Sequence, residues 1–193
     1  MKNLSILLGA TAMALVTLVA CGTSGQEEIA PTVSAVTGRT GKSAPDFEMI
    51  AYQGDDVLGG KQVRLSELLA QGKPVVLNFW AGLCPPCRFE MPEFQRVYDR
   101  YKSRIILVGV DVGTLTSLGT PEQGQALIAE LGVTYPTATT LDPEVMSAYQ
   151  VLGMPSTYFI TPAGEIIDTW TGLLNEEKLG ELVEKLLEVS SRR

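Results

Sequence analysis

Residues 75–92 read VVLNFWAGLCPPCRFEMP, and this stretch decides the fold. It opens with an apolar run, residues 75–80, that is bounded by proline and glycine, a pattern typical of a buried strand. Cys84 and Cys87 follow with two prolines between them, and a helix-like pattern begins there. A C-x-x-C pair placed where a buried strand gives way to a helix indicates a thiol–disulfide centre.

The chemistry of such a centre depends on a thiolate, because a free cysteine with a pKa of about 8.5 is mostly protonated at neutral pH. We expect Cys84 at the N-cap, where unpaired N–H groups and the positive end of the helix dipole stabilise a negative sulfur. Pro85 suits the first helical position, because its missing N–H would have no partner there. Cys87 falls one turn further and can close a disulfide. The pattern predicts Cys84 as the nucleophile and Cys87 as the resolving thiol.

A zinc half-site and an inert disulfide are the alternatives for the same two cysteines. A structural zinc site needs four ligands, usually Cys or His. The chain has no histidine and only one other cysteine, Cys21. The shortage of ligands argues against zinc, so we predict no metal and no cofactor besides the redox-active disulfide Cys84–Cys87.

The stretch resembles the active site of the thioredoxin superfamily. It is most similar to the membrane-tethered, extracytoplasmic TlpA/ResA-type thiol–disulfide oxidoreductases. The residues that carry this resemblance are Asn78-Phe79-Trp80-Ala81, Cys84-Pro85-Pro86-Cys87-Arg88, Glu90-Met91-Pro92 and Gly153-Met154-Pro155-Ser156-Thr157. The resemblance spans roughly residues 43–189 and implies an α/β fold: a thioredoxin-like mixed sheet flanked by helices, with an N-terminal β-hairpin extension and an inserted helix.

The resemblance also implies which residues meet the substrate. In this family a cis-proline faces the C-x-x-C pair, and Pro155 matches it. It would present the backbone of Met154 to an extended peptide, as in strand addition. Trp80, Pro85 and Pro86 would contact the substrate as well. The alternative for Pro155 is an ordinary turn proline ahead of a strand.

Glu90 lies on the apolar stripe of the predicted helix, which runs to about Tyr101 with Pro92 inside it. A carboxylate on a buried stripe is desolvated, and desolvation raises its pKa. That change would suit a proton acceptor for Cys87 one turn away. The family's buried acid stands three residues after the second cysteine, and Glu90 matches it. The alternative is a surface glutamate at a kink.

The N-terminal part of the chain predicts export. Residues 4–20 are almost entirely apolar and end in Leu18-Val19-Ala20-Cys21, which resembles a bacterial lipoprotein signal with Cys21 as the lipidated residue. An uncleaved transmembrane anchor is the alternative. We therefore predict a signal peptide at 1–20, the lipidated cysteine with a disordered tether at 21–42, and a thioredoxin-like domain at 43–193.

The rest of the chain predicts further elements. The side chains of residues 46–51 alternate in character, which predicts a strand with one mostly apolar face. We expect it to pair with a short strand at 62–65 and form the hairpin. Turns are expected at 55–56 and 59–60, Ser66 as a helix N-cap, and a polar loop at 114–119. Thr120 and Gln123 form a capping box for the inserted helix.

Together these observations predict an extracytoplasmic, membrane-anchored reductase of protein disulfides. Its partners would be protein disulfides, a membrane electron donor and, through the N-terminal anchor, the lipid bilayer. The net charge of −7 without a basic cluster argues against nucleic acid. We expect a monomer, and the resemblance suggests apocytochrome c cysteines as substrates. The alternatives are a disulfide oxidant or isomerase, a peroxiredoxin-like peroxidase and a Cu(I)-binding module.

Overall fold

The computed structural model describes residues 40–192. The predicted signal peptide, Cys21 and most of the predicted tether lie outside the described residues. The elements, in chain order, are β1 (Lys42–Ser43), β2 (Glu48–Gln53), α1 (Asp55–Leu58), β3 (Gln62–Arg64), α2 (Leu65–Ala70), β4 (Val75–Trp80), α3 (Pro85–Tyr101), β5 (Ile106–Asp111), α4 (Gly113–Thr116), α5 (Pro121–Leu131), β6 (Thr137–Thr139), α6 (Val145–Tyr149), β7 (Ser156–Ile160), β8 (Glu165–Thr171) and α7 (Glu176–Ser191).

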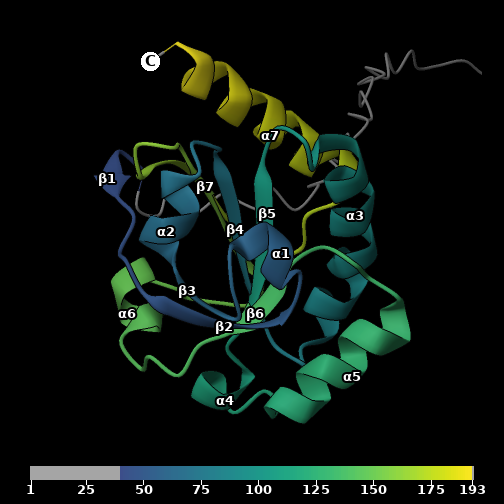
Figure 1. Cartoon of the computed structure of the whole chain (residues 1–193). Helices are drawn as coiled ribbons and strands as arrows, with labels where there is room; N and C mark the ends of the chain where they lie inside the picture. Colours follow the sequence, from purple (N-terminus) through teal and green to yellow (C-terminus); the bar gives the residue numbers. More distant parts are fainter. Residues whose placement is uncertain (1–39, 193) are drawn as a thin grey trace, which may run out of the picture. The chain divides into compact units, whose positions relative to one another are not determined.

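The strands form one mixed sheet in the order β1-β8-β7-β4-β5-β6-β2-β3 (Figure 1). Strands β4, β5 and β6 are parallel, whereas β7 pairs antiparallel with β4 and β8 antiparallel with β7. The predicted N-terminal hairpin is confirmed, because β2 pairs antiparallel with β3 and joins the sheet through β6. Lys42, the last residue of the predicted tether, pairs with Ile166 of β8.

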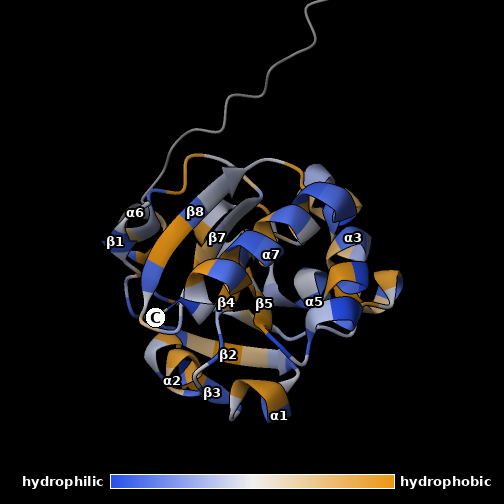
Figure 2. Cartoon of the chain, turned by 90° about the horizontal axis from the view of Figure 1, so that it is seen from above, coloured by the Kyte–Doolittle hydropathy of each residue, from blue (hydrophilic) through white to orange (hydrophobic). Residues whose placement is uncertain are grey.

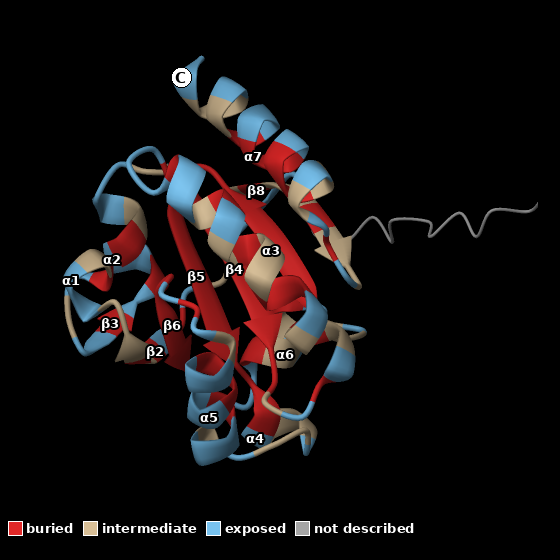
Figure 3. Cartoon of the chain, turned by 90° about the vertical axis from the view of Figure 1, so that its right-hand side faces the viewer, coloured by how far each residue is buried: buried red, intermediate tan, exposed pale blue. Residues whose placement is uncertain are grey.

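Helices cover both faces of the sheet, as predicted. Helices α3, α5 and α7 pack on one face over Val76, Trp80 and Leu107, and α2 and α6 pack on the other face over Leu77 and Phe79. Figure 3 shows α3 and α7 in front of the buried central strands. In Figure 2, polar and apolar residues alternate along α7, as expected of a helix with one buried side.

Strand β4 and helix α3 confirm the central prediction. All six residues of β4 are buried, since β4 has neighbours on both sides and helices on both faces. Cys84 is the N-cap of α3, with Pro85 and Pro86 in the first turn and Pro92 inside the helix. Burying one stripe of this 17-residue helix fixes its first turn against the end of the central strand.

Three local predictions are wrong. Residues 55–58 form the one-turn helix α1 instead of a turn, and 113–116 form the one-turn helix α4 at the start of the predicted loop. The N-cap of α2 is Arg64 rather than Ser66. The backbone N–H of Ser66 donates instead to Asp46 Oδ1 over 3.0 Å, a contact 20 residues distant in the chain. The predicted capping box of α5 is confirmed, with Gln123 N–H donating to Thr120 Oγ1.

Candidate active site

Cys84 and Cys87 form a disulfide at the N-terminus of α3, with their Cα atoms 5.3 Å apart. The backbone N–H of Cys87 donates to Cys84 Sγ over 3.3 Å, so the sulfur occupies the place of a capping oxygen. Cys84 is 4% exposed and Cys87 is fully buried. Of the two residues, Cys84 is therefore the one that contacts solvent.

Backbone contacts hold the loop that leads to Cys84. The N–H of Leu83 donates to the carbonyl of Leu118 over 2.8 Å, and the N–H of Cys84 donates to the carbonyl of Ala81 over 3.1 Å. Gly82 lies against α5: a Cβ added to it would come within 2.7 Å of the backbone nitrogen of Gly124. Only glycine fits this approach between the loop and the helix.

Glu90 is fully buried on α3, where it lies one turn after Cys87. The Asn78 side-chain amide donates to its Oε1 over 2.8 Å, and the backbone N–H of Leu174 donates to its Oε2 over 3.2 Å. Desolvation outweighs these two hydrogen bonds and raises the pKa of Glu90 to about 8. The expected desolvation is thus present, and it brings the pKa of this carboxyl close to that of a free cysteine thiol.

The Met154–Pro155 peptide bond is cis, as the resemblance implied. Met154 is half-buried and Pro155 is buried, ahead of strand β7. Pro85 is exposed at the start of α3, and Pro86 is half-buried. Trp80 needs a correction: its side chain is fully buried beneath the site, so it supports the loop and offers no surface to a substrate in this state.

Asp111 is a second buried acid that sequence reasoning missed. It ends β5 directly beside Trp80, its partner in the register of β4 and β5. The Tyr52 hydroxyl donates to its Oδ2 over 3.1 Å and the N–H of Gly113 to its Oδ1 over 2.8 Å. Burial nevertheless raises the pKa of Asp111. The available signal was an aspartate that ends an otherwise apolar strand.

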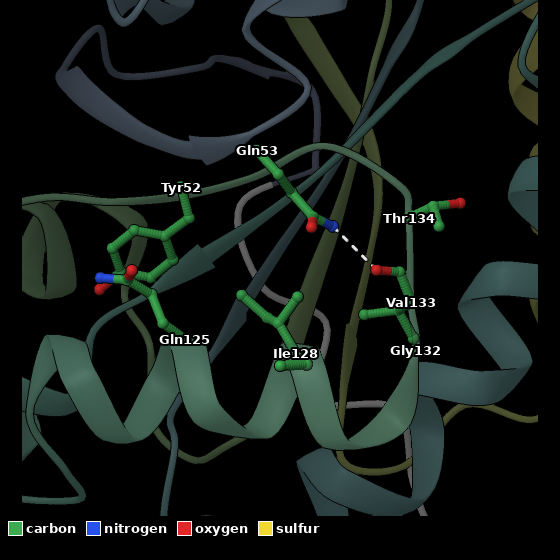
Figure 4. A pocket seen from close by; sticks show the side chains of 8 residues that line it. Tyr52, Gln53, Gln125, Ile128, Gly132, Val133 and Thr134 are labelled. Carbon is green, nitrogen blue, oxygen red and sulfur yellow. Dashed lines mark hydrogen bonds between the residues drawn. The ribbon is translucent and has the colours of Figure 1, made fainter.

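A pocket of about 280 Å³ lies between β2 and α5. Figure 4 shows Tyr52 and Gln53 on one side of it and Gln125 and Ile128 of α5 on the other. The Gln53 amide donates to the carbonyl of Val133 over 3.0 Å and closes one end. Because the Tyr52 hydroxyl also contacts Asp111, this pocket borders the strand ends that carry the active-site loop.

Comparison with known proteins identifies the family. The model of the AhpC/TSA family matches residues 40–169. The chain belongs to the AhpC/TSA family. The chain is 38% identical to the thiol-disulfide oxidoreductase ResA of Oceanobacillus iheyensis over 141 residues, which is 73% of this chain and 69% of the relative. The ResA of Geobacillus kaustophilus is 32% identical over 187 residues, 96% of this chain and 99% of that protein.

Solved structures of other proteins share the fold of this ResA-like thiol–disulfide oxidoreductase. The thioredoxin domain of a thiol-disulfide oxidoreductase from Bacteroides vulgatus superposes with a TM-score of 0.62 at 25% identity, covering 77% of this chain and 97% of that one. StoA from Bacillus subtilis gives a TM-score of 0.59 at 26% identity, covering 72% and 97%. The predicted thioredoxin-like fold is therefore confirmed.

Within residues 40–192, no helix is long and apolar enough to cross a membrane. The same part of the chain contains no group of three or more His, Cys, Asp or Glu side chains arranged to hold a metal ion.

Proposed function

We propose that this oxidoreductase reduces disulfides of proteins outside the cytoplasm, with Cys84 as nucleophile, Cys87 as resolving thiol and Glu90 as proton acceptor. One observation carries the proposal: the disulfide at the N-terminus of α3 with the buried carboxyl of Glu90 one turn behind it. A pKa near 8 matches the acceptor to a thiol, so the proton is shared at little cost in free energy.

The reaction proceeds in two exchanges. The Cys84 thiolate attacks one sulfur of the substrate disulfide, that bond breaks, and the leaving thiolate takes a proton from water. Cys87 then transfers its proton to the Glu90 carboxylate and attacks Cys84 Sγ. The second substrate sulfur leaves as a thiolate and is protonated in turn. The substrate gains two electrons and two protons, and the Cys84–Cys87 disulfide forms, to be reduced again by a dithiol donor.

The surroundings of the disulfide favour a protein substrate. Large apolar side chains are exposed on segments that flank the site: Leu83 is 54% exposed, Phe89 68%, Leu152 79% and Leu173 46%. Leu83 directly precedes Cys84, and Leu152 precedes the Met154–Pro155 bond. We call these four residues the apolar rim. Exposed apolar groups around a reactive centre are typical of surfaces that bind another protein.

We place the enzyme at the extracytoplasmic face of the bacterial membrane, anchored through lipidated Cys21. The apolar N-terminal segment with its terminal Leu18-Val19-Ala20-Cys21 supports this. A membrane electron donor would reduce the disulfide again, and apocytochrome c cysteines are the proposed substrate class. Globomycin treatment of expressing cells tests the anchor, because inhibition of lipoprotein signal cleavage would leave the precursor uncleaved. Normal maturation would exclude a lipoprotein.

Trapping tests the cysteine roles. Cys87→Ser should accumulate a mixed disulfide between Cys84 and a protein substrate, whereas Cys84→Ser should form none and should lose insulin reduction. Equal activity of Cys84→Ser and wild type would refute the proposal.

Equilibration with glutathione then separates a reductase from an oxidant, since known C-x-x-C proteins range in redox potential from about −270 to −120 mV. Peroxide consumption tests the peroxiredoxin alternative, for which Ala81 stands in place of the threonine three residues before the peroxidatic cysteine.

A further inference from the structure

Asp111 is connected to the loop before the nucleophile through a series of hydrogen bonds that begins at its side chain. The N–H of Gly113 donates to Asp111 Oδ1 over 2.8 Å. The N–H of Leu118 donates to the carbonyl of Gly113 over 2.9 Å, and the N–H of Leu83 donates to the carbonyl of Leu118 over 2.8 Å. Three hydrogen bonds thus lead from one buried carboxylate to the residue directly before Cys84.

Packing provides a second connection between the same two places. A Cβ added to Gly124 of α5 would lie 2.1 Å from Asp111 Oδ2, so the carboxylate is in contact with this helix. Gly124 in turn packs against Gly82, two residues before Cys84. Any movement of the Asp111 carboxylate therefore acts on the loop through α5 as well as through the hydrogen bonds.

The other oxygen of Asp111 connects the loop with the pocket between β2 and α5. Tyr52 lines that pocket (Figure 4). Its hydroxyl donates to Asp111 Oδ2 over 3.1 Å. Tyr52 is half-buried, and this one side chain contacts both the pocket and the carboxylate. The groups that face Asp111 are neutral, namely Tyr52 from β2, the N–H of Gly113 and Gly124 of α5; the charged group nearby is Glu122 of α5, which acts on Tyr52.

We propose that Asp111 is a positioning residue for Cys84, and that its protonation through Tyr52 at the pocket changes the reactivity of Cys84. The proposal uses the proposed function only in taking Cys84 as the nucleophile. Ionised Asp111 accepts from both Tyr52 and Gly113 and holds the loop. On acidification the Tyr52 hydroxyl passes its proton to Asp111 Oδ2 and is reprotonated from the solvent side by a hydronium ion, which leaves as water. The protonated Oδ2 then donates to Tyr52, and Oδ1, now part of a neutral carboxyl, accepts less strongly from the N–H of Gly113, which weakens the hold on the loop. Burial raises the pKa of Asp111, which brings this event closer to neutral pH.

The test is the pH profile of Cys84 alkylation by iodoacetamide in the reduced full-length Cys87→Ser protein, quantified by mass spectrometry of the Cys84 peptide. We expect two inflections, the acid one belonging to Asp111. Asp111→Asn should remove the acid inflection and change the rate at neutral pH at least threefold. Tyr52→Phe should keep that inflection but move it to higher pH, since the ionised carboxylate loses a donor. The matched control Asp56→Asn, an exposed change on α1, should leave the profile as it is.

An Asp111→Asn profile identical to that of the control would overturn the proposal. If Asp111→Asn does not fold, Tyr52→Phe decides, because an unmoved acid inflection would overturn it equally. The readout needs no protein substrate, so it is separate from the fate of the proposed reductase function. Retained insulin reduction in Cys84→Ser would refute the reductase function. An unchanged alkylation profile in Asp111→Asn or Tyr52→Phe would refute the present proposal.

Discussion

The side-chain amide of Asn78 donates to Glu90 Oε1 over 2.8 Å and ties the central strand to the active-site helix. The same amide donates to Thr157 Oγ1 over 3.1 Å, so one side chain connects β4, α3 and β7. An amide cannot neutralise the carboxylate, and desolvation therefore dominates the pKa of Glu90. The arrangement keeps an acid inside the protein without a cation, a state suited to repeated gain and loss of a proton.

Replacing Glu90 should slow the resolving step. Glu90→Gln preserves size and burial but cannot accept a proton, so we expect release of substrate from the mixed disulfide to slow by about 100-fold, the lower range for general-base catalysis. Attack by Cys84 should change little. Stopped-flow measurement of both phases with an aromatic disulfide checks this. Glu177→Gln, an exposed change on α7, is the matched control. Equal slowing of both phases would contradict the assigned role.

Glu90 should also make stability fall as pH rises. Its pKa is raised in the folded protein, so between about pH 4.5 and 8 the folded state holds a proton that the unfolded state has lost. The free energy of unfolding should decrease across this window, by at most about 5 kcal/mol at its upper end. Urea unfolding of the oxidised protein at several pH values measures the slope. Glu90→Gln should flatten it, and an unchanged slope would place the titration elsewhere.

Two helical glycines should respond oppositely to alanine. Gly124→Ala puts a Cβ 2.1 Å from Asp111 Oδ2, whereas the nearest atom to a Cβ at Gly180 is an Arg100 nitrogen 3.8 Å away. We expect Gly124→Ala to destabilise the protein by about 1–3 kcal/mol through overpacking. Gly180→Ala should stabilise it by up to about 1 kcal/mol. Thermal unfolding of the two variants checks this, and similar effects would mean that the approach of α5 to β5 is loose.

The apolar rim should matter for protein substrates alone. Phe89→Ser and Leu152→Ser remove exposed apolar surface without touching either cysteine. We expect KM for a disulfide-containing protein substrate to rise several-fold in each variant, because each large apolar contact contributes on the order of 1 kcal/mol or more. Reaction with a small aromatic disulfide should stay at the wild-type rate. Parallel assays with both substrates test this, and equal losses with both would indicate damage to the centre itself.

The sequence predicts what local pattern controls. The strand before Cys84 is uniformly apolar because both its faces are covered, and the N-cap, first-turn prolines and capping box are signals within a few residues. The desolvation of Glu90 follows from its place on the apolar stripe. The long-range partners do not: Tyr52 and Asp111 are 59 residues apart, and Leu174 lies 84 residues from the glutamate it contacts.

The errors have the same cause. Ser66 looks like a helix cap locally, but its N–H is held by Asp46 from a neighbouring segment, and the helix begins earlier. The one-turn helices α1 and α4 are too short for any periodicity to show. Trp80 ends the strand that the pattern predicts to be buried, and the resemblance alone assigns it to the substrate; its side chain is indeed fully buried.

Strand β1 has a practical consequence for work with shortened chains. Gly41 N–H donates to the carbonyl of Ile166 and Ala44 N–H to that of Gly164, so residues 41–44 protect part of the outer border of β8. A shortened chain that starts at residue 45 would leave the carbonyl of Ile166 in β8, and that of Gly164 just before it, open to another molecule's backbone. Such a preparation should self-associate on concentration, while one that starts at residue 40 should not.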